Sequence, residues 1–294
     1  LTIQGLFHLQ AGGVLALGNL VHIAVVGGAG IFQVEGNCQL ASAAEVVCSV
    51  SQGGQIRPSG AVFHIPESAT LQVEGSPAIT PHLELSWQET CTFAGVGKVL
   101  FSMNQIALAQ DSELRFDGVF ARFVHSEISG EVDSFPLSSP RIITNERMRI
   151  HNSAMDHCFI TGDFTGQNAL TIIHSSFEHV QVEGNSGGAN IASSAWEHSH
   201  FSWQETDHPV RLQDNEFSQG FDDGKPLISL HDCSNSDLRN NRLIHHREGL
   251  RISHGLVKLG CNVLKRLEAA LVMLESGYAA LNGNGHGGNS FVEN

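Results

Sequence analysis

Three stretches of the sequence place a carboxylate beside a histidine, directly after a large apolar residue. They are "HNSAMDHCF" at 151–159, "HSSFEHVQV" at 174–182 and "SSAWEHSHF" at 193–201. Neighbouring acids and histidines orient general bases and metal ligands, and carboxylates about 5 Å apart suit a retaining glycosidase. If the phrases form an active site, its candidate residues are Asp156, Glu178, Glu197, His179 and His198.

A second interpretation of the same phrases is architectural. Aligned on the apolar residue, they belong to a series that recurs about every twenty residues, which is the signature of a solenoid. The series consists of Met155, Phe177, Trp196, Phe217, Leu243 and Val263. Each position of a stacked repeat meets the same surroundings in every unit, so columns of acids and histidines arise without catalysis. The histidine column is then predicted to continue through Gln219 to His245.

The repeating units have the pattern of β-strands. Apolar and polar residues alternate in "LTIIHSSF" and "VRLQDNEF", a period of two that indicates strands joined by turns. No crossover helix fits between such strands, whereas coils of strands can stack about 4.8 Å apart. We therefore predict an all-β fold, a right-handed parallel β-helix solenoid with rungs of about twenty residues. It is predicted as a single domain over 1–294, with looser rungs over 1–127, a loop or excursion over 128–146 and regular rungs over 147–294.

The run "NNRLIHHREGLRISHGLVKLGCNVLKRLEAALVML" at 240–274 and the closing "GNGHGGNSFVEN" carry a family resemblance. They resemble right-handed parallel β-helix proteins of the pectin-lyase-like type, and most of all the large secreted surface proteins of gliding and related bacteria. The resemblance implies the fold and a secreted or cell-surface location. It does not select a function, because this fold hosts lyases, hydrolases, adhesins and inert stalks.

The net charge and the placement of polar residues argue against two kinds of partner, nucleic acid and membrane. The formal net charge is −14, with 12 Arg and only 4 Lys, and binding to phosphate needs clustered cations. We therefore expect no nucleic acid as a partner. The apolar stretch 6–32 is interrupted by His8, Gln10, Asn19 and His22, so no membrane insertion is expected either. An acidic surface is compatible with cations or neutral sugars.

Metals, thiols and tryptophans supply weaker candidates. Neither "HExxH" nor an Asp-rich calcium loop is present, so no metal site or cofactor is predicted, with calcium left possible. Cys38 and Cys48 are close enough in sequence to be a disulfide candidate in an oxidising compartment. Trp196 lies at the repeated apolar position and is predicted to be in the core. Trp203 is predicted to be exposed and is the candidate for carbohydrate binding.

Two functional hypotheses follow. The first is a non-enzymatic structural or adhesive segment of a secreted or cell-surface bacterial protein. The second is a polysaccharide-acting enzyme, a lyase or glycosidase, or a carbohydrate-binding module of the same fold. Because the sequence starts at Leu1 without methionine, we expect a processed product or a segment of a longer polypeptide. Open solenoid ends expose strand edges, so we also expect them to meet the rest of that polypeptide or a docking partner.

Overall fold

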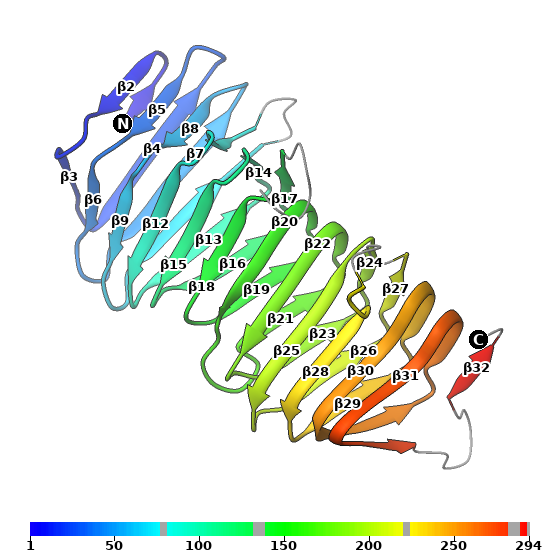
Figure 1. Ribbon diagram of the computed structural model, residues 1–294. Helices are drawn as coiled ribbons and strands as arrows, with labels where there is room; N and C mark the ends of the chain where they lie inside the picture. The colour runs from blue at the N-terminus through cyan, green and yellow to red at the C-terminus, as the bar shows by residue number, and fades with distance from the viewer. Residues whose placement is uncertain (77–80, 132–138, 220–223, 282–288, 293–294) are drawn as a thin grey trace. The chain divides into compact units, whose positions relative to one another are not determined.

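The computed structural model describes residues 1–76, 81–131, 139–219, 224–281 and 289–292. Strands are the only regular elements in these ranges, with no helix among them. They form a parallel β-solenoid of about 12 turns, each of about 23 residues (Figure 1). The predicted all-β parallel solenoid is confirmed, and its coils are slightly longer than predicted. The chain divides into two compact units, Leu1–Cys158 and Phe159–Asn294, so a single continuous solenoid with a right-handed sense stays a prediction.

The first unit consists of three parallel ladders, in which each strand pairs with the third strand after it. The first ladder contains β1 (Thr2–Ile3), β4 (Leu20–Val26), β7 (Glu45–Ser51), β10 (Thr70–Glu74), β13 (Lys98–Ser102), β16 (Phe120–Val124) and β19 (Met148–His151). The second contains β2 (Leu6–Leu9), β5 (Ile31–Val34), β8 (Gln55–Pro58), β11 (Leu83–Leu85), β14 (Gln105–Leu108), β17 (Glu127–Gly130) and the start of β20 (Ala154–Asp163). The third contains β3 (Val14–Leu17), β6 (Asn37–Leu40), β9 (Val62–Ile65), β12 (Thr90–Gly95), β15 (Glu113–Asp117) and β18 (Arg141–Thr144).

The second unit repeats this plan with shorter corners. One ladder contains β21 (Leu170–Ile173), β23 (Ala189–Ala192), β26 (Val210–Gln213) and β29 (Ser236–Arg239). Another contains β22 (Ser176–Asn185), β24 (Ala195–Glu197) and β27 (Glu216–Ser218), and a third contains β25 (His200–Thr206) and β28 (Ile228–Cys233). The long strands β30 (Arg242–Gly260) and β31 (Val263–Leu281) pass through successive ladders, and β32 (Ser290–Val292) pairs with β31.

The core follows from strand alternation, because every second side chain points into the coil. Register then places like residues on top of one another. In the first unit the Phe93 ring stacks between Phe63 and Phe116, at centroid distances of 5.0 and 5.3 Å. In the second unit the Trp196 indole stacks on the Phe177 ring at 4.2 Å. Such columns of buried rings fix which residues face inward in each coil.

The predicted repeat is confirmed for most of the second unit. Phe177 pairs with Trp196, Trp196 with Phe217, and Phe217 with Leu243. The last member is wrong by one position, since Leu243 pairs with Leu264 and not with Val263. Leu264 is buried in the column, and a slip of one residue in a strand moves a side chain to the opposite face.

The loop predicted over 128–146 is narrower than expected. Strand β17 continues to Gly130 and β18 spans Arg141–Thr144, so strands occupy parts of both ends of the predicted loop, and 132–138 are outside the described residues. Most of the closing phrase "GNGHGGNSFVEN" also lies outside the described residues, apart from the part around β32.

The structure does not form the disulfide predicted between Cys38 and Cys48. Both are free and buried thiols that point into the coil from β6 and β7. Burial raises the pKa of each to about 12, which keeps the unreactive thiol form and is typical of structural cysteines.

Candidate functional site

The histidine of each acid–histidine phrase lies at a bend with left-handed backbone geometry. In the second unit this bend recurs in five successive coils of the described chain, and we call its column the acid–histidine corner. Its members are His179, His198, Gln219, His245 and Arg266, with φ values of 52°, 46°, 49°, 54° and 53°. Left-handed φ is strained for most residues, and histidine is among the few that occur there more often. Corner geometry therefore accounts for the histidines. The predicted continuation through Gln219 to His245 is confirmed, since Ser218 and Ile244, which precede them, are paired.

The acids of this corner form a ladder on the outside of the coil. Glu178 and Glu197 are direct register partners on β22 and β24, and both are exposed. The next positions in the column are Ser218 and Ile244, so the acidic series stops after two coils. The His179 and His198 rings stack in parallel, with centroids 4.8 Å apart and an interplanar angle of 3°.

The phrase at 151–159 supplies its Asp156 and His157 at the end of the first unit. His157 has the same left-handed geometry, with a φ of 48°. Its Nδ1 lies 2.5 Å from Oδ1 of Asp156, which is the register partner of Ser129 on β17. This contact joins two consecutive residues, Asp156 before the bend and His157 at it.

One group at the acid–histidine corner has the composition of a metal site. Ligand atoms of Glu178, His179 and His198 all lie within 4.8 Å of one another. Two imidazoles and a carboxylate suit zinc or a related transition metal. They do not suit calcium, which takes six to eight oxygen ligands. Strand stacking alone accounts for this proximity, because neighbouring coils repeat about every 4.8 Å.

A second corner of the same unit faces the interior, and we call it the serine–asparagine corner. Five successive described coils here have an exposed left-handed residue followed by a buried polar one. The buried residues are Ser175, Ser194, Asn215, Asn241 and Asn262. Asn241 Nδ2 donates to Leu212 O at 2.8 Å and to Asn262 Oδ1 at 3.0 Å. Its own Oδ1 accepts from the backbone N–H and the side-chain amide of Asn215, at 3.1 and 3.0 Å.

The predicted exposure of Trp203, on which its candidacy for carbohydrate binding depended, is wrong. Its side chain is fully buried, and its Nε1 donates to Gly187 O at 2.7 Å. The indole fills the space above Gly184, its register partner, where a side chain would collide with the ring. A buried ring presents no face to a sugar. Trp196 is buried as predicted.

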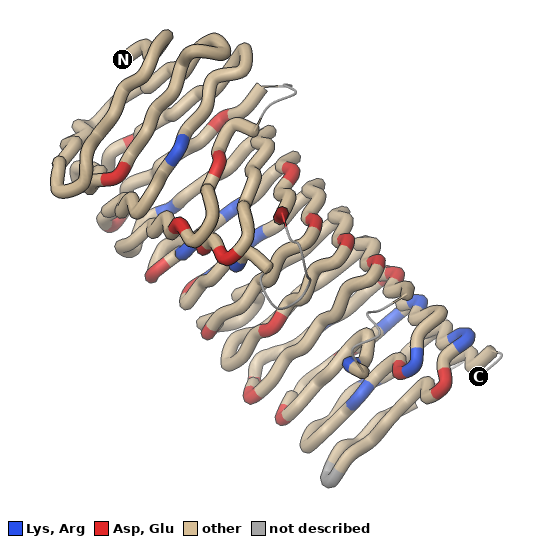
Figure 2. Tube along the Cα trace, turned by 45° about the horizontal axis from the view of Figure 1, so that its top comes forward, with Lys and Arg blue, Asp and Glu red and all other residues tan. Residues whose placement is uncertain are grey.

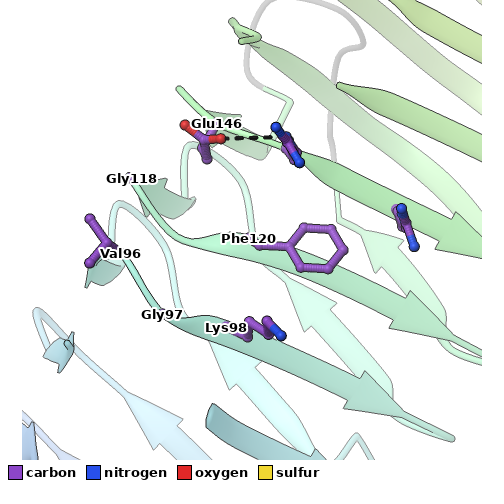
Figure 3. Close-up of a pocket in the computed structure, with 8 residues that line it drawn as sticks. Val96, Gly97, Lys98, Gly118, Phe120 and Glu146 are labelled. Atoms are coloured by element: carbon purple, nitrogen blue, oxygen red, sulfur yellow. Dashed lines mark ion pairs between the residues drawn. The ribbon is translucent and has the colours of Figure 1, made fainter. Parts of the chain in front are cut away.

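Cations that the sequence analysis did not single out gather on the first ladder of the first unit. We call this surface the basic face, and it consists of Lys98, Phe120, Arg122, Arg147 and Arg149. Four of these residues line a pocket of about 380 Å³, together with Val96, Gly97, Gly118 and Glu146 (Figure 3). The exception is Arg122, on the strand between Lys98 and Arg149. In the sequence, each of "KVLF", "ARFV" and "RMRI" has a cation at a position whose side chain points out of the coil. Only a coil-by-coil alignment of the first half reveals that these positions are neighbours.

A second pocket in the first unit, of about 370 Å³, lies at the corner between its first and second ladders, which we call the interior corner of the first unit. His82, Asn104 and Ser126 contribute buried side chains to its lining. His82 Nδ1 accepts a hydrogen bond from the Gln105 backbone N–H at 3.0 Å. Desolvation by burial lowers the pKa of His82, which favours its neutral imidazole.

The fold and these corners define the class of protein, a parallel β-solenoid. Comparison with solved structures gives a similar one, the periplasmic alginate epimerase AlgG, with a TM-score of 0.54 and 11% sequence identity. The alignment covers 92% of this chain and 78% of the epimerase. Two substituted forms of that enzyme give TM-scores of 0.53 and 0.52. No family model and no curated protein matches the sequence. At this identity the likeness shows the fold alone.

No helix that is long and apolar enough to cross a membrane occurs among the described residues.

Proposed function

We propose that this chain is a non-enzymatic structural or adhesive β-helix segment of a secreted or cell-surface protein. The observation that carries the proposal is the geometry of the acid–histidine corner. Its histidines occupy the left-handed bend in successive coils, and its two acids lie one above the other on the exposed side. A catalytic site requires dissimilar groups that converge once on a substrate. A ladder of like groups at a bend is instead the product of stacking.

Neither pocket of the first unit described above contains the predicted catalytic acids or histidines. Glu178 is itself an exposed side chain, with 61% of its surface accessible. An enzyme that protonates a glycosidic bond holds its acid in an environment that raises the pKa, commonly by excluding water. The exposed corner does not supply such an environment, which supports the structural reading over a lyase or a glycosidase.

The outer strands of the described chain support the proposal of a docking partner. Near the amino end, Leu6, Val14 and Leu20 are 64%, 57% and 84% exposed. Near the carboxyl end, Tyr278 and Phe291 are 66% and 49% exposed. Apolar side chains beside strand edges favour the addition of further strands. We propose that each end stacks against another coil, from the same polypeptide or from a docking partner. The epimerase is periplasmic by its description, which is compatible with a secreted location here.

The test of the proposed function is turnover. The purified chain is incubated with alginate, polygalacturonate and neutral glucans, with and without calcium. Reducing ends and ultraviolet absorbance report hydrolysis and lyase cleavage, and proton NMR of the alginate reports epimerisation without cleavage. We expect no change in any substrate. Turnover that is lost in Glu178→Gln or Glu197→Gln would overturn the proposal and make the corner an active site. Turnover that survives both substitutions would also overturn it and place the chemistry elsewhere.

A further inference from the structure

The basic face is a positively charged surface on a protein whose net charge is negative. Strands β13, β16 and β19 lie side by side in the first ladder, with Lys98 opposite Phe120 and Arg122 opposite Arg149. Arg147 directly precedes β19 and its carbonyl accepts the N–H of Ala121, so it continues the column of Lys98 and Phe120. Figure 2 shows basic segments on neighbouring coils of the first unit. The outward positions of these three strands include no Asp or Glu, although the whole chain carries a net charge of −14.

These cations are not neutralised within the described part of the chain. Lys98, Arg122 and Arg149 make no ion pair with a described residue. Arg147 has one, to Glu146 at 3.8 Å, and both side chains are partly exposed, so the pair adds little stability. Like charges on adjacent strands are unfavourable. Stability alone therefore does not explain the cluster, whereas a bound anion would compensate it.

An aromatic ring lies among the cations. Phe120 is half-buried and projects from the outward side of β16, as Lys98 does from β13 (Figure 3). The Arg149 guanidinium lies 5.3 Å from the centroid of this ring. Contact with the ring holds the guanidinium in place, so that its remaining N–H groups are available to a carboxylate in a bidentate arrangement. The ring face gives an apolar platform beside them.

The corner that borders the pocket holds two glycines, Gly97 and Gly118, that closely approach a neighbouring coil. Gly118 has a φ of +77°, which favours glycine, and a side chain there would collide with the Gly95 carbonyl oxygen. At Gly97 a side chain would collide with Ile65 and Ala69. Larger residues at either position would require a change of backbone, so close packing between coils fixes the glycines at this edge of the pocket.

We propose that the basic face binds a carboxylate-bearing linear polysaccharide. Arg122 and Arg149 are register partners on strands about 4.8 Å apart, and Lys98 and Arg147 lie on either side of Phe120 in the adjacent column. The cations therefore match a chain that presents carboxylates in series rather than one isolated anion. Phe120 offers an apolar surface for a sugar ring, and the arginines offer paired donors for its carboxylate. Nucleic acid is disfavoured because the overall charge is strongly negative and four cations are few for a phosphate backbone. The site goes beyond the proposed function, since binding here requires neither catalysis nor an adhesive role.

Binding of polygalacturonate to the intact chain, measured by calorimetry, tests the proposal. The fully methyl-esterified polymer serves as the uncharged ligand and single-stranded DNA as the alternative polyanion. We expect binding to polygalacturonate that weakens with salt, none to the ester, and weaker binding to DNA. The double variant Arg122→Gln/Arg149→Gln should lose affinity by at least about tenfold, as removal of charge-assisted contacts implies.

Arg141→Gln is the matched control, because it removes an exposed cation from the third ladder of the same unit. It should bind as the unmodified chain does. Phe120→Ala should weaken binding by a few-fold without altering its salt dependence, and circular dichroism checks that each variant folds. Absence of binding to polygalacturonate, equal binding of the ester, equal loss in Arg141→Gln, or tighter binding of DNA would each overturn the proposal. The turnover assay is independent of these outcomes, so either proposal can fail alone.

Discussion

The two corners of the second unit impose the same backbone geometry in opposite surroundings. At the serine–asparagine corner the left-handed residue is exposed, and the polar side chain after it is buried and fully hydrogen-bonded along the stack. At the acid–histidine corner the left-handed residue is itself the histidine, half-buried, and the acid before it is exposed. A polar residue that repeats from coil to coil can therefore have two different structural causes. At the serine–asparagine corner the repeated side chains stabilise the stack by hydrogen bonds. At the acid–histidine corner histidine recurs because it tolerates the left-handed backbone of the bend.

The largest effect is expected from the buried column. Asn241→Ala removes two donated and two accepted hydrogen bonds and leaves Leu212 O and the Asn215 amide without their partner. We expect a loss of about 2–4 kcal/mol in the free energy of unfolding, measured by urea denaturation. Asn240→Gly is the matched control at the adjacent exposed left-handed position, and it should remain within about 0.5 kcal/mol of the parent. Similar losses in both variants would remove the distinction between the corners.

At the acid–histidine corner the shape of the backbone should matter more than the imidazole. His198→Val puts a β-branched residue at a φ of 46°, and we expect it to cost about 1–2 kcal/mol. His198→Asn, which tolerates the same φ, should be close to the parent. If the Asn variant is as unstable as the Val variant, or if zinc raises the melting temperature of the parent alone, the ring has a role as a ligand.

A pH prediction extends the comparison to the interior corner of the first unit. Burial lowers the pKa of His82 below its ordinary value near 6.5, so below that pH the unfolded chain binds a proton that the folded chain does not. Stability of the first unit should then be complete above about pH 6.5 and fall as the pH drops below it. His82→Asn retains an acceptor for the Gln105 N–H and does not titrate. Its melting temperature should depend less on pH between 7 and 5; an unchanged dependence would assign the effect to other groups.

The smallest effect is expected from the paired acids. Glu178→Gln and Glu197→Gln each remove one of two like charges on adjacent exposed positions. We expect changes within about 0.5 kcal/mol, toward greater stability at low salt and vanishing at high salt. A clear loss of stability in either variant would show that the acids have a partner that the ladder does not account for.

Much of the fold was predictable because its evidence is periodic. Alternation and the recurring Phe177, Trp196 and Phe217 identify the coils, and stacking fixes their register. The sequence did not allow a correct prediction of which way side chains point in the strand after a bend. The left-handed residue His198 resets the alternation, so Trp203 points inward where simple parity left it exposed. Gly184, one coil earlier, was the available signal, because the small residue leaves room for the indole.

The basic face was missed for a different reason. Lys98, Arg122 and Arg149 are far apart in the sequence, and their coils vary in length, so no fixed period relates them. Only the pairing of β13, β16 and β19 brings them together. The total charge of −14 also suggests an acidic surface throughout, because a sum over the chain does not report where the few cations lie.

The variable length of the coils has a consequence for how such a chain can be altered. Ser176 pairs with Ala195 across a short coil and Val263 pairs with Ser290 across a longer one, yet both pairs hold the same column in line. Additional residues leave the stack at a bend and return at the same register. Foreign peptides or whole modules inserted after a corner residue such as Gln219 should therefore be displayed outside the coil, whereas a single-residue insertion within a strand would reverse the inward and outward faces up to the next bend.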